Sequence, residues 1–245
     1  MIGLLLSLCA FASTSADAIQ ADLQRWDTQI DQHANYQIEW RAGDFERLAK
    51  GEIVKRRTKL DGADRVIGAV WAPVSLQETW VSVQDELHWG LVDGLVEERL
   101  SGSTFQNKIL YQRIKAPWPF KDRQWIIEIV NNLTLLEATE HKVIERHWDL
   151  TDRRGAKAEV EDGVWIPVND GGWLAMEAGG GTLLVYHVRT NPGGNIPDEA
   201  ATQWTMLTLG GMMKGLRDRS LEMKGHYLGD HPPVLWPDGT AIPLF

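Results

Sequence analysis

Two histidines and a glutamate are the side chains of this sequence that most resemble metal ligands. His141, Glu145 and His147 lie in the run from His141 to Leu150, which is typical of a β-strand, and alternate residues of a strand share one face. At the rise of a strand, His141 and His147 would stand about 20 Å apart. Because one metal ion cannot reach both, we expect no metal site here, and we identify none elsewhere.

Side chains for acid, base or nucleophilic chemistry are present but form no known catalytic motif. There is no G-x-S-x-G sequence for a nucleophilic serine, and no serine stands beside a credible base. Glu128, within the apolar run Gln124–Val130, either faces solvent or needs a partner, since an unpaired buried carboxylate is costly. His187 and Arg189 share one face of the run Thr182–Thr190 and point either into a cavity or to solvent. The sequence therefore assigns no catalytic residue.

A rigid corner separates the two most regular strand patterns of the chain. The run Asn107–Lys115 alternates between two faces, and Gln124–Val130 is rich in residues that favour strands. Between them, Pro117 and Pro119 remove two backbone donors and favour an extended loop that carries Trp118. The first run places Leu110, Gln112 and Ile114 on one face and Ile109, Tyr111 and Arg113 on the other.

Several other runs have the composition of strands and predict a sheet that continues on both sides of this corner. The run Arg65–Val74 is apolar on both faces, which predicts a central position in the sheet. Gly179 to Gly181 join two runs as a hairpin, whereas a phosphate-binding loop would lead into a helix. The other predicted strands are Tyr36–Trp40, Gly51–Leu60, Leu95–Leu100, His141–Leu150, Val164–Pro167, Gly172–Glu177 and Thr182–Thr190.

Three helices are expected. Ser75 and Glu78 form a capping box ahead of a short helix, and a long final helix runs from Pro197 toward Met223. Glycine and paired methionines in its middle, Gly210 to Met213, favour an adaptable wall against a variable apolar guest; close packing of the helix on a sheet is the alternative. The first helix, Ile19–Gln32, carries Ile19, Leu23, Trp26 and Ile30 at helical spacing.

The length suits one large domain or two small ones with a sizeable core, and we expect a single domain and a monomer. The chain has 245 residues, and we find no internal repeat and no linker that would mark a domain boundary. The net charge of -9 provides no broad basic surface for nucleic acid, which we do not expect as a partner. Twelve tryptophans are present, and most are expected in packing.

The first 18 residues have the pattern of a signal peptide. An apolar run too short to span a bilayer is followed by small residues, with Ala16 and Ala18 where a signal peptidase needs them. We therefore expect an exported protein, in the bacterial periplasm. The only cysteine, Cys9, lies in this leader, so the mature chain would hold no disulfide and no thiol. The domain would span residues 19–225, followed by an extended, surface-bound tail over residues 226–245.

Two segments resemble the START (StAR-related lipid transfer) domains. Tyr111 to Trp125, YQRIKAPWPFKDRQW, is similar to the strand, proline corner and "RD-aromatic" signature of that family. Thr182 to Pro197, TLLVYHVRTNPGGNIP, is similar to the penultimate strand, glycine corner and entrance to the closing helix. Asp85 followed by Trp89 resembles an Asp-loop-Trp pattern of the family. The resemblance covers residues 20 to 220 in the expected order.

The resemblance implies an α+β helix-grip fold, in which a curved antiparallel sheet wraps around the long C-terminal helix. It further implies a hydrophobic tunnel that holds one lipid, gated by that helix or a neighbouring loop, with no cofactor. The residues that we expect to contact the ligand are Tyr111, Arg123, Trp125, Tyr186, His187, Trp204, Leu207, Gly211 and Met212.

Departures from the family pattern bear on the ligand. Arg123 matches the family's arginine, but Gln124 stands where an aspartate is usual. Leu110 and Ile129 occupy the positions at which sterol-binding members carry a buried acid and arginine. Because this polar anchor for a sterol hydroxyl is missing, the pattern favours acyl lipids or other apolar molecules.

Three functions follow from these patterns. The first is a carrier that binds a lipid without turnover and meets membranes transiently, with Trp118 on its stiff loop as a candidate membrane contact. The second is an enzyme of the same superfamily, a cyclase, aromatase or hydrolase, which would need an acid and a base converging in the cavity. The third is a ligand-sensing module, which would usually be fused to another domain.

Overall fold

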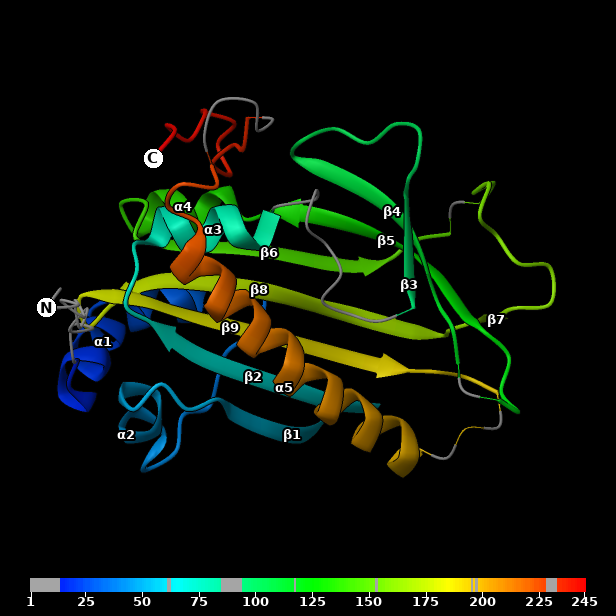
Figure 1. Ribbon diagram of the computed structural model, residues 1–245, viewed down its shortest axis with the longest axis horizontal. Coiled ribbons are helices and arrows are strands. Elements are labelled where there is room, and N and C mark those ends of the chain that lie inside the picture. The colour runs from blue at the N-terminus through cyan, green and yellow to red at the C-terminus, as the bar shows by residue number, and fades with distance from the viewer. Residues whose placement is uncertain are drawn as a thin grey trace, which may run out of the picture.

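An antiparallel sheet forms the centre of the molecule (Figure 1). The computed structural model describes residues 14–60, 63–84, 94–116, 118–152, 154–194, 196, 198–227 and 233–245. Within these residues the strands pair in the order β1-β2-β9-β8-β6-β5-β4-β3, and β7 pairs in parallel with β5. The strands are β1 (Val54–Leu60), β2 (Ala63–Ala72), β3 (Leu95–Arg99), β4 (Asn107–Ile114), β5 (Arg123–Asn131), β6 (Val143–Leu150), β7 (Val164–Trp165), β8 (Val168–Ala178) and β9 (Gly181–Asn191).

Helices cover both faces of this sheet. They are α1 (Ala16–His33), α2 (Asp44–Ala49), α3 (Leu76–Gln84), α4 (Leu133–Ala138) and α5 (Asp198–Glu222). The predicted apolar stripe of α1, Ile19, Leu23, Trp26 and Ile30, is buried as expected, and with α2 it packs on the outer face of the sheet. Helix α5, drawn in orange, crosses the inner face (Figure 1). The predicted helix-grip architecture is therefore confirmed.

The inner core lies between the sheet and the helices α3 and α5. On α5, Leu209, Met213 and Leu216 are buried in it, opposite Val66 and Val70 of β2. The long helix therefore lies directly on β2. As predicted for a strand that is apolar on both faces, β2 is an interior strand, paired with β1 on one side and β9 on the other, although it lies next to the edge of the sheet rather than at its centre.

The capping box at the start of α3 is confirmed. The Glu78 carboxylate accepts hydrogen bonds from the backbone and hydroxyl of Ser75 at 2.8 and 2.7 Å, and the Glu78 backbone N–H donates to the Ser75 hydroxyl at 3.2 Å. This reciprocal pair satisfies backbone donors that the first turn of a helix leaves without partners.

The short helices α2 and α4 were not predicted, and two further parts of the chain differ from expectation. Tyr36–Trp40 is not a strand: the Asn35 backbone N–H donates to the Glu145 carboxylate and the Tyr36 ring stacks on a sheet residue, so its alternation reflects packing on the sheet. The tail is more than a surface segment. Val234 and Ile242 are buried in the inner core, and the Val234 backbone N–H donates to the Tyr227 hydroxyl at 2.8 Å.

No helix in the described ranges combines the length and the apolar character needed to cross a bilayer.

Candidate functional site

A pocket of about 540 Å³ lies between the inner face of the sheet and α5. Alternate residues of β3, β4, β5, β6, β8 and β9 face it, because successive side chains of a strand point to opposite sides. Helix α5 contributes Thr205, Thr208, Leu209 and Met212, and α3 contributes Val83 and Gln84. The curvature of the sheet therefore leaves space under one part of α5, while another part packs directly on β2.

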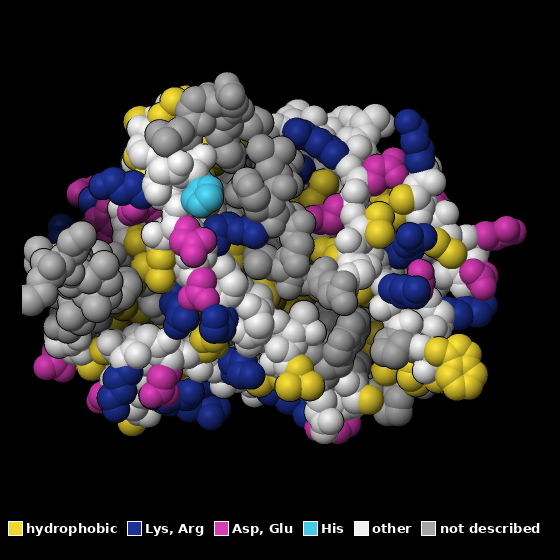
Figure 2. All heavy atoms as spheres, in the orientation of Figure 1, with side chains coloured by type: hydrophobic (Ala, Val, Ile, Leu, Met, Phe, Trp, Pro, Cys, Tyr) yellow, Lys and Arg dark blue, Asp and Glu magenta, His cyan; other side chains and the backbone are white. Residues whose placement is uncertain are grey.

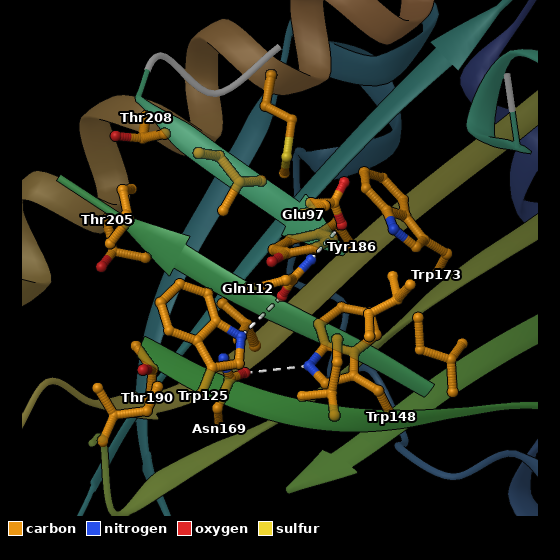
Figure 3. Close-up of a pocket in the computed structure, with 18 of the residues that line it drawn as sticks. Glu97, Gln112, Trp125, Trp148, Asn169, Trp173, Tyr186, Thr190, Thr205 and Thr208 are labelled. Atoms are coloured by element: carbon orange, nitrogen blue, oxygen red, sulfur yellow. Dashed lines mark hydrogen bonds between the residues drawn. The ribbon is translucent and has the colours of Figure 1, made fainter. Parts of the chain in front are cut away.

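Aromatic rings form one wall of this pocket (Figure 3). The ring centroids of Trp173 and Tyr186 are 4.5 Å apart, and those of Trp148 and Tyr186 are 5.6 Å apart. Burial raises the pKa of the Tyr186 hydroxyl above its ordinary value, so this group stays neutral. Around these rings lie aliphatic side chains: Leu95, Leu110, Ile114, Ile127, Ile129 and Val188. Such a wall suits the apolar part of a ligand.

A chain of hydrogen bonds fixes the polar side chains next to this wall. The Trp125 indole N–H donates to the Gln112 side-chain oxygen at 2.7 Å, and the Gln112 amide donates to the Glu97 carboxylate at 2.5 Å (Figure 3). The Trp148 indole N–H donates separately to the Asn169 side-chain oxygen at 3.0 Å. Each tryptophan is thus held in one orientation by its polar edge while its ring faces the pocket.

Besides Arg123 of β5, four charged residues line the pocket: Glu97 and Arg99 on β3, Lys108 on β4 and Arg146 on β6. We call them the charged cluster. Burial, together with the neighbouring cation Arg146, lowers the pKa of Lys108 to about 7. Burial also lowers the pKa of Arg146 to about 10, an effect that Glu97 partly opposes. The Glu97 carboxylate is reached by solvent from the pocket, yet the surrounding protein raises its pKa above the ordinary value.

Four of the residues predicted to contact ligand line the pocket: Arg123, Trp125, Tyr186 and Met212. Arg123 donates to the backbone oxygens of Pro192 and Gly193 at 3.1 and 3.2 Å, so it fastens the glycine corner after β9 to the pocket rim. Burial lowers its pKa from the ordinary value. Leu110 and Ile129, the positions where the family pattern lacked its polar anchor, also line the pocket.

Tyr111 and His187 project from the opposite face of the sheet. The Tyr111 hydroxyl is hydrogen-bonded to Gln124 and to the Ala158 backbone oxygen, both at 2.9 Å, under the loop that follows β6. His187 Nδ1 lies 2.6 Å from the Arg65 guanidinium, and burial with this neighbouring cation lowers the pKa of His187 to about 3. Strand alternation excludes both side chains from the pocket, because Gln112 and Tyr186 next to them face it.

The outer side of α5 carries two further predicted contacts. Leu207 is 74% exposed, and Gly211 faces open space, so neither points toward the sheet. Both lie on the helix face opposite Leu209 and Met212, as a period of 3.6 residues requires. Trp204 belongs to α5, but its side chain lies outside the described part of the structure, as do Asp85 and Trp89.

The remaining candidate side chains have structural partners. Glu145 is buried and accepts hydrogen bonds from the Asn35 backbone at 2.9 Å and the Asn132 side chain at 2.6 Å. Glu128 accepts a hydrogen bond from the Asn107 amide at 2.5 Å on the outer face. His141 lies in the turn before β6. Among the described residues, no group of three or more His, Cys, Asp or Glu side chains could hold a metal ion.

The charged cluster was missed from the sequence. Charged residues on a strand usually mark its solvated face. A charged residue that lines a pocket is therefore easily assigned to the solvent side instead. The signal was present in β4, because Lys108 shares its face with Leu110, Gln112 and Ile114, all of which line the pocket.

The chain has the helix-grip fold of the START type. It matches no family model, and no curated protein is significantly similar to it. Among solved structures, the StAR-related lipid transfer protein of Xanthomonas axonopodis is 20% identical, with 69% of this chain and 93% of that one covered and a TM-score of 0.55. Human StAR-related lipid transfer protein 5 is 12% identical, with 84% and 97% covered and a TM-score of 0.56. Human STARD10 is also 12% identical, with 82% and 79% covered and the same TM-score.

At these identities the likeness establishes the shared fold and leaves the ligand to be inferred from the pocket of this chain.

Proposed function

We propose that this protein binds one lipid or similar apolar molecule between the sheet and α5 and carries it without chemical turnover. The observation that supports this most strongly is the pocket itself. Its volume of about 540 Å³ lies within the range of roughly 300–1,000 Å³ that is usual for small-molecule sites. Each buried CH₂ group would contribute about 0.8 kcal/mol, so an acyl chain against the aromatic wall would bind tightly. The lipid-transfer proteins that share the fold support the same proposal.

Mass spectrometry of organic extracts from the purified protein tests this proposal. We expect one class of lipid at close to one molecule per chain. A protein that is repeatedly empty after purification, and that takes up no fluorescent fatty acid, phospholipid or sterol, would contradict it.

An enzyme that uses the same pocket is the second candidate, because Glu97 and Lys108 both have pKa values shifted toward neutrality. Their positions favour the carrier. Glu97 is paired in register with Gln112, which is four residues from Lys108 on β4, so their backbones are separated by about 13 Å along the strand. Re-isolating the extracted ligand after prolonged incubation distinguishes the two functions. A carrier returns it unchanged, whereas an enzyme returns a product of altered mass.

Transfer would require the protein to meet a membrane, and the corner between β4 and β5 suits this role. Trp118 is 93% exposed there and Phe120 is 39% exposed. Figure 2 shows hydrophobic side chains at the edge of the molecule where Figure 1 places this corner. Ile114 and Arg123, which flank the corner in sequence, line the pocket. A membrane that receives Trp118 would therefore lie near the pocket rim.

Export to the bacterial periplasm is also part of the proposal. It rests on the signal-peptide pattern of the first 18 residues, of which residues 1–13 lie outside the described ranges.

A further inference from the structure

Arg146 is the pocket residue that an apolar ligand alone does not explain. It projects from the inner face of β6, two residues before Trp148, and lines the pocket. A guanidinium carries five N–H donors in a planar fork. Within the described part of the structure, no hydrogen bond or ion pair engages the Arg146 side chain. Its donors therefore face the space that a ligand would occupy.

A charge in this position needs a partner. Arg146 is half-buried, and the protein around it lowers its pKa. A guanidinium that loses part of its water in this way is stabilised by an acceptor or an opposite charge. Glu97 is close enough to oppose the effect of burial on Arg146, but Gln112 holds this carboxylate through a hydrogen bond. An acceptor on the ligand would complete the coordination of Arg146 without displacing Gln112.

The charged residues around Arg146 determine which charge the acceptor group of the ligand should carry. Arg99 and Lys108 each lie near enough to Arg146 to interact with it electrostatically, and Glu97 is the single acid among the charged residues described as lining the pocket. An ammonium headgroup would meet mainly like charges here. An alcohol or ester would accept from Arg146 but leave most of the cationic charge uncompensated.

We propose that the charged cluster binds the anionic headgroup of an amphipathic ligand, a carboxylate or a phosphate, with Arg146 as the principal contact and the apolar chain against Trp148, Trp173 and Tyr186. This inference rests on the proposed function and adds the chemical class of the ligand. A planar fork of donors matches the paired oxygens of a carboxylate or phosphate, and such charge-assisted bonds are stronger than neutral ones.

Three ligands with the same chain test the headgroup: dodecanoate, dodecyl phosphate and dodecanol. Their dissociation constants would be measured by calorimetry on delipidated full-length protein and on Arg146→Met. Methionine fills similar space without a charge, so this variant is expected to fold, and circular dichroism checks this. Arg146→Lys keeps the charge and serves as a second variant. Arg113→Gln is the matched control, because Arg113 leaves the same sheet on its outer face.

We expect the wild-type protein to bind at least one anion about tenfold or more tightly than dodecanol. Arg146→Met should lose that preference while its affinity for dodecanol stays within about twofold, Arg146→Lys should keep part of it, and Arg113→Gln should keep all of it. The anion that binds more tightly separates a carboxylate site from a phosphate site. Equal affinity for all three ligands, or a preference that survives in Arg146→Met, overturns the inference but leaves the carrier function standing. Failure of all three to bind overturns both.

Discussion

Lys108 shows how a single buried charge makes the stability of this fold depend on pH. In the folded protein its pKa is about 7, whereas an unfolded chain titrates near 10.5. Between these values the unfolded state holds more protons, so stability rises with pH. Below pH 7 the folded protein holds Lys108 as a buried ammonium group, which lowers its stability.

Lys108→Met removes this cost. We expect the variant to be more stable than the wild type at pH 6, and the gap to narrow as the pH rises from 7 toward 10, by up to about 1.4 kcal/mol per pH unit. Urea denaturation of both proteins between pH 6 and pH 9.5 measures this difference in unfolding free energy. Curves that run parallel over this range would show that Lys108 titrates normally in the folded state.

Glu145 is a second buried charge, with a structural role. Its carboxylate accepts hydrogen bonds from the Asn35 backbone after α1 and from Asn132, whose own oxygen caps α4 through the Leu135 N–H at 3.0 Å. Glu145→Ala would strand these donors, and we expect a loss of about 3 kcal/mol in unfolding free energy. Glu177→Ala is the control, because its ion pair with Lys142 is exposed and should contribute under about 1 kcal/mol. Equal losses in the two variants would refute this role.

The pocket-lining residues show what could be predicted at this scale. Trp125 and Met212 were predictable, because a strand signature and a methionine pair in a helix both mark the inner core. Tyr186 and His187 were both assigned to the ligand, although neighbours on a strand cannot face the same side. Arg146 could not be assigned, since nothing local distinguishes an arginine that faces a pocket from one that faces water.

Helix α5 depends on a glycine in the strand beneath it. A Cβ added at Gly68 of β2 would lie 2.8 Å from Leu209 Cδ1 and 3.1 Å from Met213 Cγ. Gly211 on the outer side of α5 faces open space. The same substitution at these two sites should therefore have opposite effects.

We expect Gly68→Ala to lose about 1–2 kcal/mol of unfolding free energy through overpacking, and Gly211→Ala to gain about 0.5–1 kcal/mol through helix propensity. Chemical denaturation provides both values. Two variants that change stability in the same direction would show that α5 does not lie on β2 as described.

Elements with a strong internal period were predictable, and short elements were not. The stripe of α1 and the alternation of β4 persist long enough to define a face. Helix α2 has six residues and begins after Gly43, which has a positive φ of 85°. Because glycine has no side chain, no capping residue marks the start of this helix in the sequence. Helix α4 also has six residues, but its cap, Asn132 three residues before Leu135, was a usable signal. Both short helices are held by tertiary packing rather than by their own propensity.

At the scale of the whole molecule, the exposed corner and the pocket belong to one region. Trp118 and the exposed lysines Lys115 and Lys121 would meet an anionic bilayer together. We expect Trp118→Ser to reduce co-sedimentation with vesicles of phosphatidylglycerol and phosphatidylcholine about threefold or more, without changing the affinity for soluble dodecanoate. Leu244→Ser, an exposed apolar residue in the tail, is the control. If Trp118→Ser binds vesicles like the wild type, this corner is not the membrane contact.

The topology of the molecule explains why a pocket forms here. Leu209 and Met213 hold α5 on β2, and among the described elements α5 contacts the next strand of the sheet, β9, much less closely. The order of the strands could be anticipated from the resemblance to START domains. The size of the pocket could not, because it depends on how far the sheet curves and on how many large side chains fill the space.

The central claim is that a single ligand occupies this pocket. The fluorescence of the tryptophans that line the pocket can test this claim. Trp125, Trp148 and Trp173 line the space, so a bromine-labelled dodecanoate bound there should quench their fluorescence on contact. Titration of the delipidated protein should give quenching that saturates at one ligand per chain. Quenching that is absent, or that rises without saturation as it does for free indole in solution, would contradict the claim.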